Sequence, residues 1–212
     1  METHVVVRVW LPDRPGALGL VASRIGATGA DIVGIDVLER SEHVAVDEFA
    51  VVLQREDLVH LLVREVEEVD GASVEEWRIV ERFPDPRIDA LESVEYICDA
   101  SGLDDLRRRL VERVHREFDA DWAALLRDET LLATAGTDPP LAPVLHALAT
   151  GTAASPTVAA GEHGPDDLAI APLSAHGAVL LVGREGHPFR TRERGQLMVL
   201  ARIADRLVKF VG

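Results

Sequence analysis

The sequence is poor in cysteine and lysine, and each shortage excludes a class of protein. It has one cysteine, Cys98, which rules out an intramolecular disulfide and a metal cluster built on several cysteines. Its only lysine is Lys209, and 22 basic residues against 37 acidic ones give a formal net charge of −15. This balance argues against a surface for nucleic acid or for an anionic membrane, because both require basic residues.

Long apolar runs are also missing. No run reaches the roughly 18 residues that a membrane span needs, and the N-terminus, METHVVVRVW, has no apolar core typical of a signal peptide. We therefore expect a protein of the reducing cytoplasm that makes no membrane contact. The 212 residues, of which 47% are apolar, can bury the core of one large domain or of two small ones.

Catalytic and metal-binding patterns do not appear. The eight histidines form neither an i, i+4 pair nor an H-E-x-x-H motif, and no serine lies in a G-x-S-x-G context. Cys98 lies on an apolar helical face, which predicts a small core residue. The arginines of the segment 107–116 stand among acidic residues, which favours intrahelical ion pairs over a phosphate site. We predict no catalytic residue, no metal site and no cofactor.

The first half of the chain is predicted to alternate strands and helices. Val5 to Trp10 is a β-branched strand that Pro12 ends, since proline cannot donate to a ladder. Helical spacing of apolar residues follows from Leu18 to Ile25, and a second strand covers Asp31 to Leu38. The remaining elements are a strand over Val44–Leu53, a helix over Arg55–Val69 and a strand over Ser73–Val80. The order βαββαβ predicts a ferredoxin-like fold with both helices on one face.

The loop before the first helix is the best candidate for chemistry. A helix start leaves unpaired N–H groups with partial positive charge, which favours a carboxylate or phosphate. Gly16 has no Cβ and lets a ligand come close, and Asp13 could accept from an ammonium group. Two interpretations remain open: the loop grips both ends of a free amino acid, or Asp13 only caps the helix and Gly16 only makes the turn.

The segment 4–80 resembles the ACT domain, a regulatory module that binds amino acids. The resemblance depends on the loop sequence from Asp13 to Leu18, D-R-P-G-A-L, and on Gly29-Ala30-Asp31-Ile32. It implies that two such domains pair and that a ligand binds between them. The residues implied to line the site are Asp13, Arg14, Gly16, Ala17 and Leu18, with Asp31 and Ile32 opposite. Amino-acid-binding ACT loops often carry Asn or His where this sequence has Asp13 and Arg14, so the ligand's identity stays open.

A second domain is predicted after a linker. Pro84 and Pro86 stiffen residues 82–88, which gives domains at 1–81 and 89–212. The predicted helices of the second domain are Asp89–Ala100, Leu103–Phe118, Val144–Ala149 and Thr191–Phe210. Its predicted strands are Trp122–Arg127, Thr130–Thr134, Leu168–Pro172 and Ala178–Val182, with Val158 in a further short strand or extended segment.

The end of this domain resembles a GAF domain, a sensory module with an antiparallel sheet flanked by helices. The resemblance depends on Pro172-Leu173, the Gly177 turn, the strand Leu180 to Gly183 and the helix entry Pro188-Phe189. Together with the ACT-like first half, it implies an α+β fold for the whole chain: a ferredoxin-like domain followed by a GAF-like antiparallel sheet flanked by helices. The region between Thr134 and Leu168 is short for the family, which predicts that no large ligand pocket forms.

These expectations favour a non-catalytic regulatory protein that senses an amino acid or a similar small metabolite. It would act as a homodimer and pass the signal to an unidentified protein effector. Two alternatives stay open. One is a ligand-free dimerisation or adaptor module, and the other is an enzyme, which would need a cluster of titratable groups in a pocket.

Overall fold

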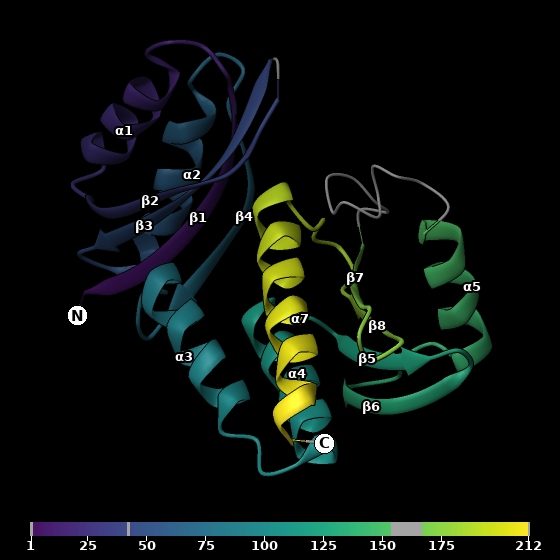
Figure 1. Ribbon diagram of the computed structural model, residues 1–212. Coiled ribbons are helices and arrows are strands. Elements are labelled where there is room, and N and C mark those ends of the chain that lie inside the picture. Colours follow the sequence, from purple (N-terminus) through teal and green to yellow (C-terminus); the bar gives the residue numbers. More distant parts are fainter. Residues whose placement is uncertain (1, 42, 154–166, 212) are drawn as a thin grey trace. The chain divides into compact units, whose positions relative to one another are not determined.

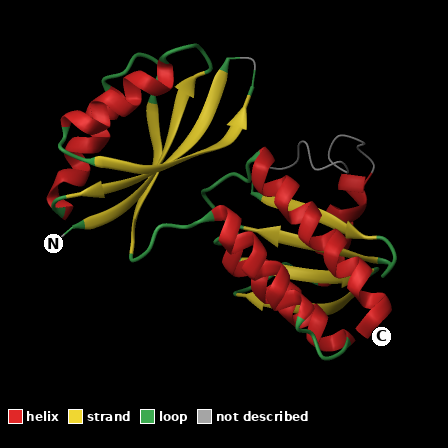
Figure 2. Ribbon diagram, turned by 60° about the vertical axis from the view of Figure 1, so that its left-hand side comes forward, coloured by secondary structure: helices red, strands yellow, loops and turns green. Residues whose placement is uncertain are grey.

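The computed structural model describes residues 2–41, 43–153 and 167–211, and the chain divides into two compact units between Pro84 and Asp85 (Figures 1 and 2). The division falls inside residues 82–88, the segment predicted as a linker. Helix α3 (Pro86–Cys98) already begins there, because the Asp85 side chain accepts from the backbone N–H groups of Arg87 and Ile88. Proline at the first helical position adds to this start, since its missing N–H is not needed there.

The first unit has the predicted order of elements. They are β1 (Thr3–Pro12), α1 (Ala17–Ala27), β2 (Asp31–Arg40), β3 (Val44–Leu53), the 3₁₀ turn η1 (Glu56–Leu58), α2 (Val59–Glu67) and β4 (Ser73–Val80). The strands form an antiparallel sheet in the order β2-β3-β1-β4. The predicted ferredoxin-like βαββαβ fold is thereby confirmed, and β2 and β4 are the edges of its sheet.

Both helices cover one face of this sheet (Figure 1). Cross-strand pairs such as Val5–Val51 and Val7–Phe49 point to that face and are fully buried. Val21 of α1 packs against them, as do buried aliphatic residues of α2. Each such side chain contributes about 1.5–3 kcal/mol through burial. The same row of β3 also carries a carboxylate, Asp47, among these apolar side chains.

The second unit is an antiparallel sheet between helices. Its elements are α3, α4 (Leu103–Glu117), β5 (Trp122–Arg127), β6 (Thr130–Gly136), α5 (Ala142–Ala153), β7 (Leu168–Leu173), β8 (Ala178–Gly183) and α7 (Thr191–Val211). The strand order is β6-β5-β8-β7. Helices α3, α4 and α7 pack on one face and α5 on the other (Figure 2). This confirms the predicted α+β class and the sheet flanked by helices.

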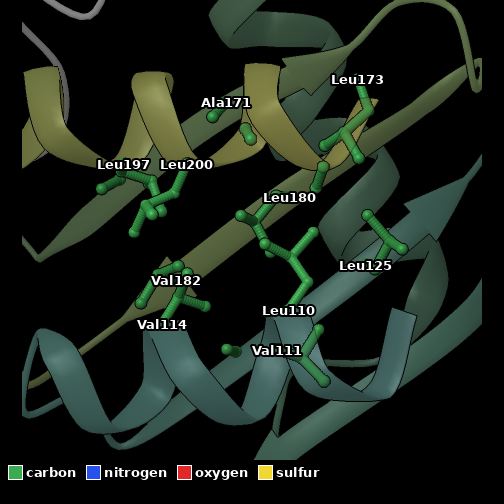
Figure 3. Close-up of a cluster of buried hydrophobic side chains, with 14 of the residues drawn as sticks. Leu110, Val111, Val114, Leu125, Ala171, Leu173, Leu180, Val182, Leu197 and Leu200 are labelled. Atoms are coloured by element: carbon green, nitrogen blue, oxygen red, sulfur yellow. The ribbon is translucent and has the colours of Figure 1, made fainter. Parts of the chain in front are cut away.

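The larger core of this unit lies between the sheet and helices α4 and α7. Figure 3 shows Leu110 and Val114 of α4 opposite Leu197 and Leu200 of α7, with Leu180 and other strand residues between them. Their helical and alternating spacings are those from which the elements were predicted. The predicted strand at Val158 lies outside the described residues.

Two predictions about single residue types have different outcomes. Cys98 is exposed, not a core residue, because it is the last residue of α3 and its helix neighbour Ile97 takes the buried position. The arginines of α4 do form intrahelical ion pairs: Asp105 binds Arg108 and Arg109, and Arg113 binds Glu117. None of the helices in the described ranges has the length and apolar character that a membrane span requires.

Candidate functional site

A recess of about 230 Å³ lies where the β1–α1 loop meets strands β2 and β3. Its lining consists of Leu11, Pro12, Asp13, Arg14, Leu18, Val37, Arg40, Ala45 and Asp47. At about 30 Å³ per molecule, this space corresponds to roughly eight waters. The recess therefore has room for a small metabolite and not for a nucleotide-sized ligand.

The recess forms because the β1–α1 loop turns back over strands β2 and β3. The backbone N–H of Asp13 donates to the carbonyl of His43 at 3.0 Å, which holds the loop against the start of β3. Gly16 has a φ of 90°, a left-handed conformation that favours glycine, and directs the chain into α1. The turn predicted at Gly16 is therefore present, and it orients Leu18 toward the recess.

Asp13 and Arg40 form an ion pair at the recess. The Arg40 Nη2 donates to Asp13 Oδ1 at 2.7 Å, and Nε donates to Oδ2 at 3.3 Å, so both carboxylate oxygens are engaged. The hydrogen bond with Asp13 raises the pKa of Arg40 above its ordinary value. The start of α1 has no side-chain cap, so the interpretation of Asp13 as only a helix cap is wrong. Asp13 instead fixes the guanidinium of Arg40 beside the recess.

Asp47 is the unusual residue of the site. It is only 3% exposed, and its Oδ1 atom has no hydrogen-bond partner within the described part of the chain. Its cross-strand neighbours on β1 and β2 are Val9 and Val37. Burial raises the pKa of the Asp47 carboxyl, and the charge of Arg40 opposes that rise only in part. A buried polar atom without a partner calls for an explanation, because nearly all such atoms are paired in folded proteins.

The structure brings together only some of the residues implied to line the site. Asp13, Arg14 and Leu18 border the recess, and Arg14 also lies 3.8 Å from Asp70. Gly16 shapes the turn but does not border the recess. Ala17 is 2% exposed and belongs to the hydrophobic core, since the first turn of α1 points it inward.

Asp31 and Ile32 lie at the other end of β2 from Arg40. Nine residue-to-residue steps of about 3.3 Å each separate Asp31 from Arg40, a distance of about 30 Å. Neither residue borders the recess of its own chain. Their predicted place opposite the loop would have to be provided by a second copy of the domain and stays a prediction.

Two charged residues of the recess were missed by the sequence reasoning, Arg40 and Asp47. A signal for Asp47 was present: in V-A-V-D-E-F-A-V-V-L it takes an inward position of the alternation, between Ala45 and Phe49. A carboxylate at such a position breaks the apolar face of a strand. Arg40 carried no local signal, because only the sheet register brings it to Asp13.

A second recess, of about 600 Å³, lies in the second unit, which differs from the prediction that no large pocket forms there. Its lining residues are Asp121, Trp122, Thr137, Asp138, Pro140, Leu148, Asp167, Leu168, Gly183, Arg184 and Glu185. The four acidic residues among them are exposed. No group of three or more acidic, histidine or cysteine side chains in the described residues could hold a metal ion.

The buried charge of that second recess is fully engaged. The Arg184 guanidinium donates to the carbonyls of Phe118, His187 and Pro188 at 2.6–2.9 Å and to both carboxylate oxygens of Glu193. Such a set of partners holds the β8–α7 connection in place. Among the described residues, the second recess therefore offers no unpaired buried group to a ligand.

Comparisons with known proteins give likenesses of fold at low sequence identity. No family model and no curated protein sequence matches the chain. The similar solved structures include the ACT domain from the GTP pyrophosphokinase of Chlorobium tepidum, with 12% identity and a TM-score of 0.32 over 40% of this chain and 92% of that one. They also include the GAF domain from an Acinetobacter phosphoenolpyruvate-protein phosphotransferase, with 16% identity and a TM-score of 0.44 over 60% of this chain and 95% of that one.

A third similar structure is the phytochrome photosensory core module of Stigmatella aurantiaca. It is 12% identical with a TM-score of 0.41, and the match covers 84% of this chain and 42% of that one. The ACT and GAF domains to which the sequence motifs point thus both occur among the similar structures. Because identities and TM-scores are low, the fold assignment depends on the sheet orders β2-β3-β1-β4 and β6-β5-β8-β7.

Proposed function

We propose that this chain is a non-catalytic regulatory protein that binds an amino acid or a similar small metabolite in the recess beside the β1–α1 loop. The proposal depends on one observation: the recess combines groups of opposite charge with apolar side chains in a small volume. Asp13 and Asp47 supply negative charge, Arg40 supplies positive charge, and Leu11 and Val37 supply apolar contact. Ligand sites typically combine such an apolar lining with a few placed polar groups.

We further propose that the first unit pairs with a second copy through β2. This strand is an edge of the sheet, so its outer N–H and C=O groups are open to another strand. Three of its apolar side chains, Val33, Ile35 and Val37, are 40–52% exposed. Such an edge is an uncommon liability in a protein that stays monomeric, and a homodimer would cover it.

Coupling between the two events follows from shared residues. Val37 and Arg40 belong both to the recess and to β2. A ligand that prefers one arrangement of the paired strands shifts the population toward it. An effector protein that distinguishes the two arrangements would then respond to the ligand.

Calorimetric titration with the twenty L-amino acids tests the proposal, using the full chain and an Arg40→Ala variant. We expect at least one amino acid to bind and the variant to lose that binding, because the ligand carboxylate loses its cation. Arg55→Ala is the matched control, since Arg55 pairs with Asp57 on the surface of the same unit, outside the recess. Absence of binding at millimolar concentration, or unchanged binding by Arg40→Ala, contradicts the proposal.

A second candidate function is a ligand-free dimerisation module, and the exposed apolar residues of β2 favour it. Sedimentation of Ile35→Lys should give monomers if β2 is the interface, because a charge at that position opposes edge pairing. Ile79→Lys is the control, since Ile79 is similarly exposed on the other edge strand, β4. A dimer that depends on Ile35 but binds no amino acid would select this second function.

A further inference from the structure

We propose that Asp47 accepts the ligand's ammonium group and so makes the recess selective for primary amines; this inference rests on the function proposed above. A molecule that offers the same carboxylate but no ammonium would then be rejected. The ligand class is a small zwitterion, with its ammonium on Asp47 and its carboxylate on Arg40.

Without a ligand, Asp47 is a buried carboxylate with an unpaired oxygen. A carboxylate that is 3% exposed normally has hydrogen-bond donors around it, yet Oδ1 has none among the described residues. The residue also borders the recess. Since Oδ1 itself is buried, an occupant meets this oxygen only when the carboxyl group rotates toward the recess. An ammonium group has three N–H donors and a positive charge, and it supplies what this carboxylate lacks.

Asp13, the acceptor expected from the sequence, already forms an ion pair with Arg40. Both of its oxygens accept from Arg40, so the charge of Asp13 is already paired with the guanidinium, whereas Oδ1 of Asp47 has no partner among the described residues. Arg40 uses its Nε and Nη2 groups in this pair. A guanidinium has five N–H donors, which leaves donors of Arg40 for a ligand carboxylate.

Asp47 and Arg40 thus place negative charge in one part of the recess and positive charge in another. Asp47 is buried in the row of β3, and Arg40 is at the exposed end of β2, with its side chain 67% exposed. A zwitterion would enter with the ammonium first and leave the carboxylate toward the opening. Val37 lies on β2 directly across from Asp47 and borders the recess, and it would contact the carbon chain.

Proton release is a consequence that can be measured on the unaltered protein. Asp13 and Arg40 are the charged groups that act on Asp47, and burial leaves its pKa raised. A bound ammonium favours the ionised carboxylate, which lowers that pKa again. Binding near the raised pKa must therefore release protons from Asp47, and affinity must increase with pH through that range.

The experiment titrates the full chain with L-amino acids, each beside the 2-hydroxy acid in which a hydroxyl replaces the ammonium, such as L-alanine and L-lactate. We expect the amino acid to bind about tenfold or more tightly than its hydroxy acid, as for a charge-assisted hydrogen bond. In Asp47→Asn this preference should disappear, because the amide has no charge. Asp57→Asn is the control, since it removes one exposed carboxylate of the same unit outside the recess.

The possible outcomes separate the two proposals. If amino acids bind but hydroxy acids bind equally well, or if Asp47→Asn keeps the preference, this inference is overturned and the proposed function stands. If no amino acid binds the unaltered chain, both are overturned. If Asp47→Asn does not fold, the ratio of the two probes on the unaltered chain and the proton release, measured in buffers of different ionisation enthalpy, decide the inference.

Discussion

Each unit buries one charged side chain beside a recess, and the two side chains differ in how they are satisfied. Arg184 in the second unit is 7% exposed and donates to three carbonyls and to Glu193. Asp47 in the first unit is 3% exposed and has an oxygen with no partner in the described chain. A fully paired buried charge holds structure, whereas an unpaired one leaves its interaction open to a ligand.

Whether a recess binds a ligand therefore depends less on its volume than on whether its buried polar groups already have partners. The recess beside Arg184 is the larger, at about 600 Å³ against about 230 Å³. Its buried guanidinium is occupied, and its acidic residues face solvent. The smaller recess holds an unsatisfied buried carboxylate and an arginine with donors to spare. This contrast is the reason for placing the ligand in the first unit.

The largest expected effect is the loss of stability on removing Arg184, the fully paired buried charge. We expect Arg184→Ala to destabilise the second unit by about 3–5 kcal/mol, because Glu193 and three carbonyls lose their donor at once. Urea unfolding followed by circular dichroism measures the loss. Arg202→Ala is the control, since Arg202 lies exposed on helix α7 of the same unit. A change below 1 kcal/mol for Arg184→Ala would mean that the network holds little of the fold.

A smaller effect is expected at the wall of the same recess. Trp122 of β5 pairs across the sheet with Gly183 of β8, and a Cβ added to Gly183 would lie 2.3 Å from the indole ring. Gly183→Ala should therefore displace Trp122 and cost about 1–3 kcal/mol through overpacking. The fluorescence of Trp122, in a background with Trp10 and Trp77 replaced by Phe, reports the displacement. Gly195→Ala is the control, because no other described atom beyond its chain neighbours and the backbone of its own helix lies within 4 Å of the added Cβ.

Much of the fold was predictable because alternation and helical spacing are local. The inward positions of β1 and β3 and the apolar stripe of α2 indicate buried faces without any knowledge of partners. Element ends were harder. The start of α3 at Pro86 was missed because the two nearby prolines favoured a linker, while the Asp85 cap promotes a helix.

The site was predictable only where it coincides with the loop. Asp13 and Leu18 are close in sequence to Gly16, so a turn and a helix start were enough to group them. Arg40 reaches Asp13 across 27 positions through the sheet register, which no local pattern contains. Ala17 shows the opposite error: its place in the loop motif predicted a lining residue, but the helix directs it into the core.

Removing the unpaired charge of Asp47 should stabilise the protein, whereas removing Arg184 should destabilise it. Because burial raises the pKa of Asp47 above its unfolded value, its ionisation costs stability at neutral pH. We expect Asp47→Asn to stabilise the free protein at pH 7 by on the order of 1 kcal/mol. The gain should shrink as the pH falls toward the unfolded pKa of about 3.9 and should vanish only well below it, where the carboxyl is neutral in both states.

Thermal unfolding of both proteins from pH 3.5 to 8 checks this prediction, and Asp57→Asn provides the comparison with an exposed carboxylate. A stability gain together with loss of amine selectivity would identify Asp47 as a residue that serves binding at the expense of folding. Destabilisation of Asp47→Asn at pH 7 would instead show that the carboxylate has a structural partner.

The smallest effect concerns His176, a buried side chain of the second unit. It is less fully paired than Arg184 but, unlike Asp47, it has a hydrogen-bond partner. Its Nε2 accepts from the Nε of Arg107 at 3.1 Å, and Asp205 accepts from its backbone N–H. Burial, followed by the charges of Arg107 and Arg127, lowers the pKa of His176, so the folded protein favours the neutral ring. The unfolded chain then binds a proton more readily. Stability should fall as pH decreases below about 6.5, until the ring is protonated in both states.

His176→Gln should remove this step, because the amide oxygen still accepts from Arg107 but does not titrate. The measurement is the midpoint of thermal unfolding between pH 5 and 8, for which we expect a difference of a few degrees. His146→Gln is the matched control, since that ring makes one exposed hydrogen bond to the carbonyl of Asp128. If the step survives in His176→Gln, another group causes it and the prediction for His176 is wrong.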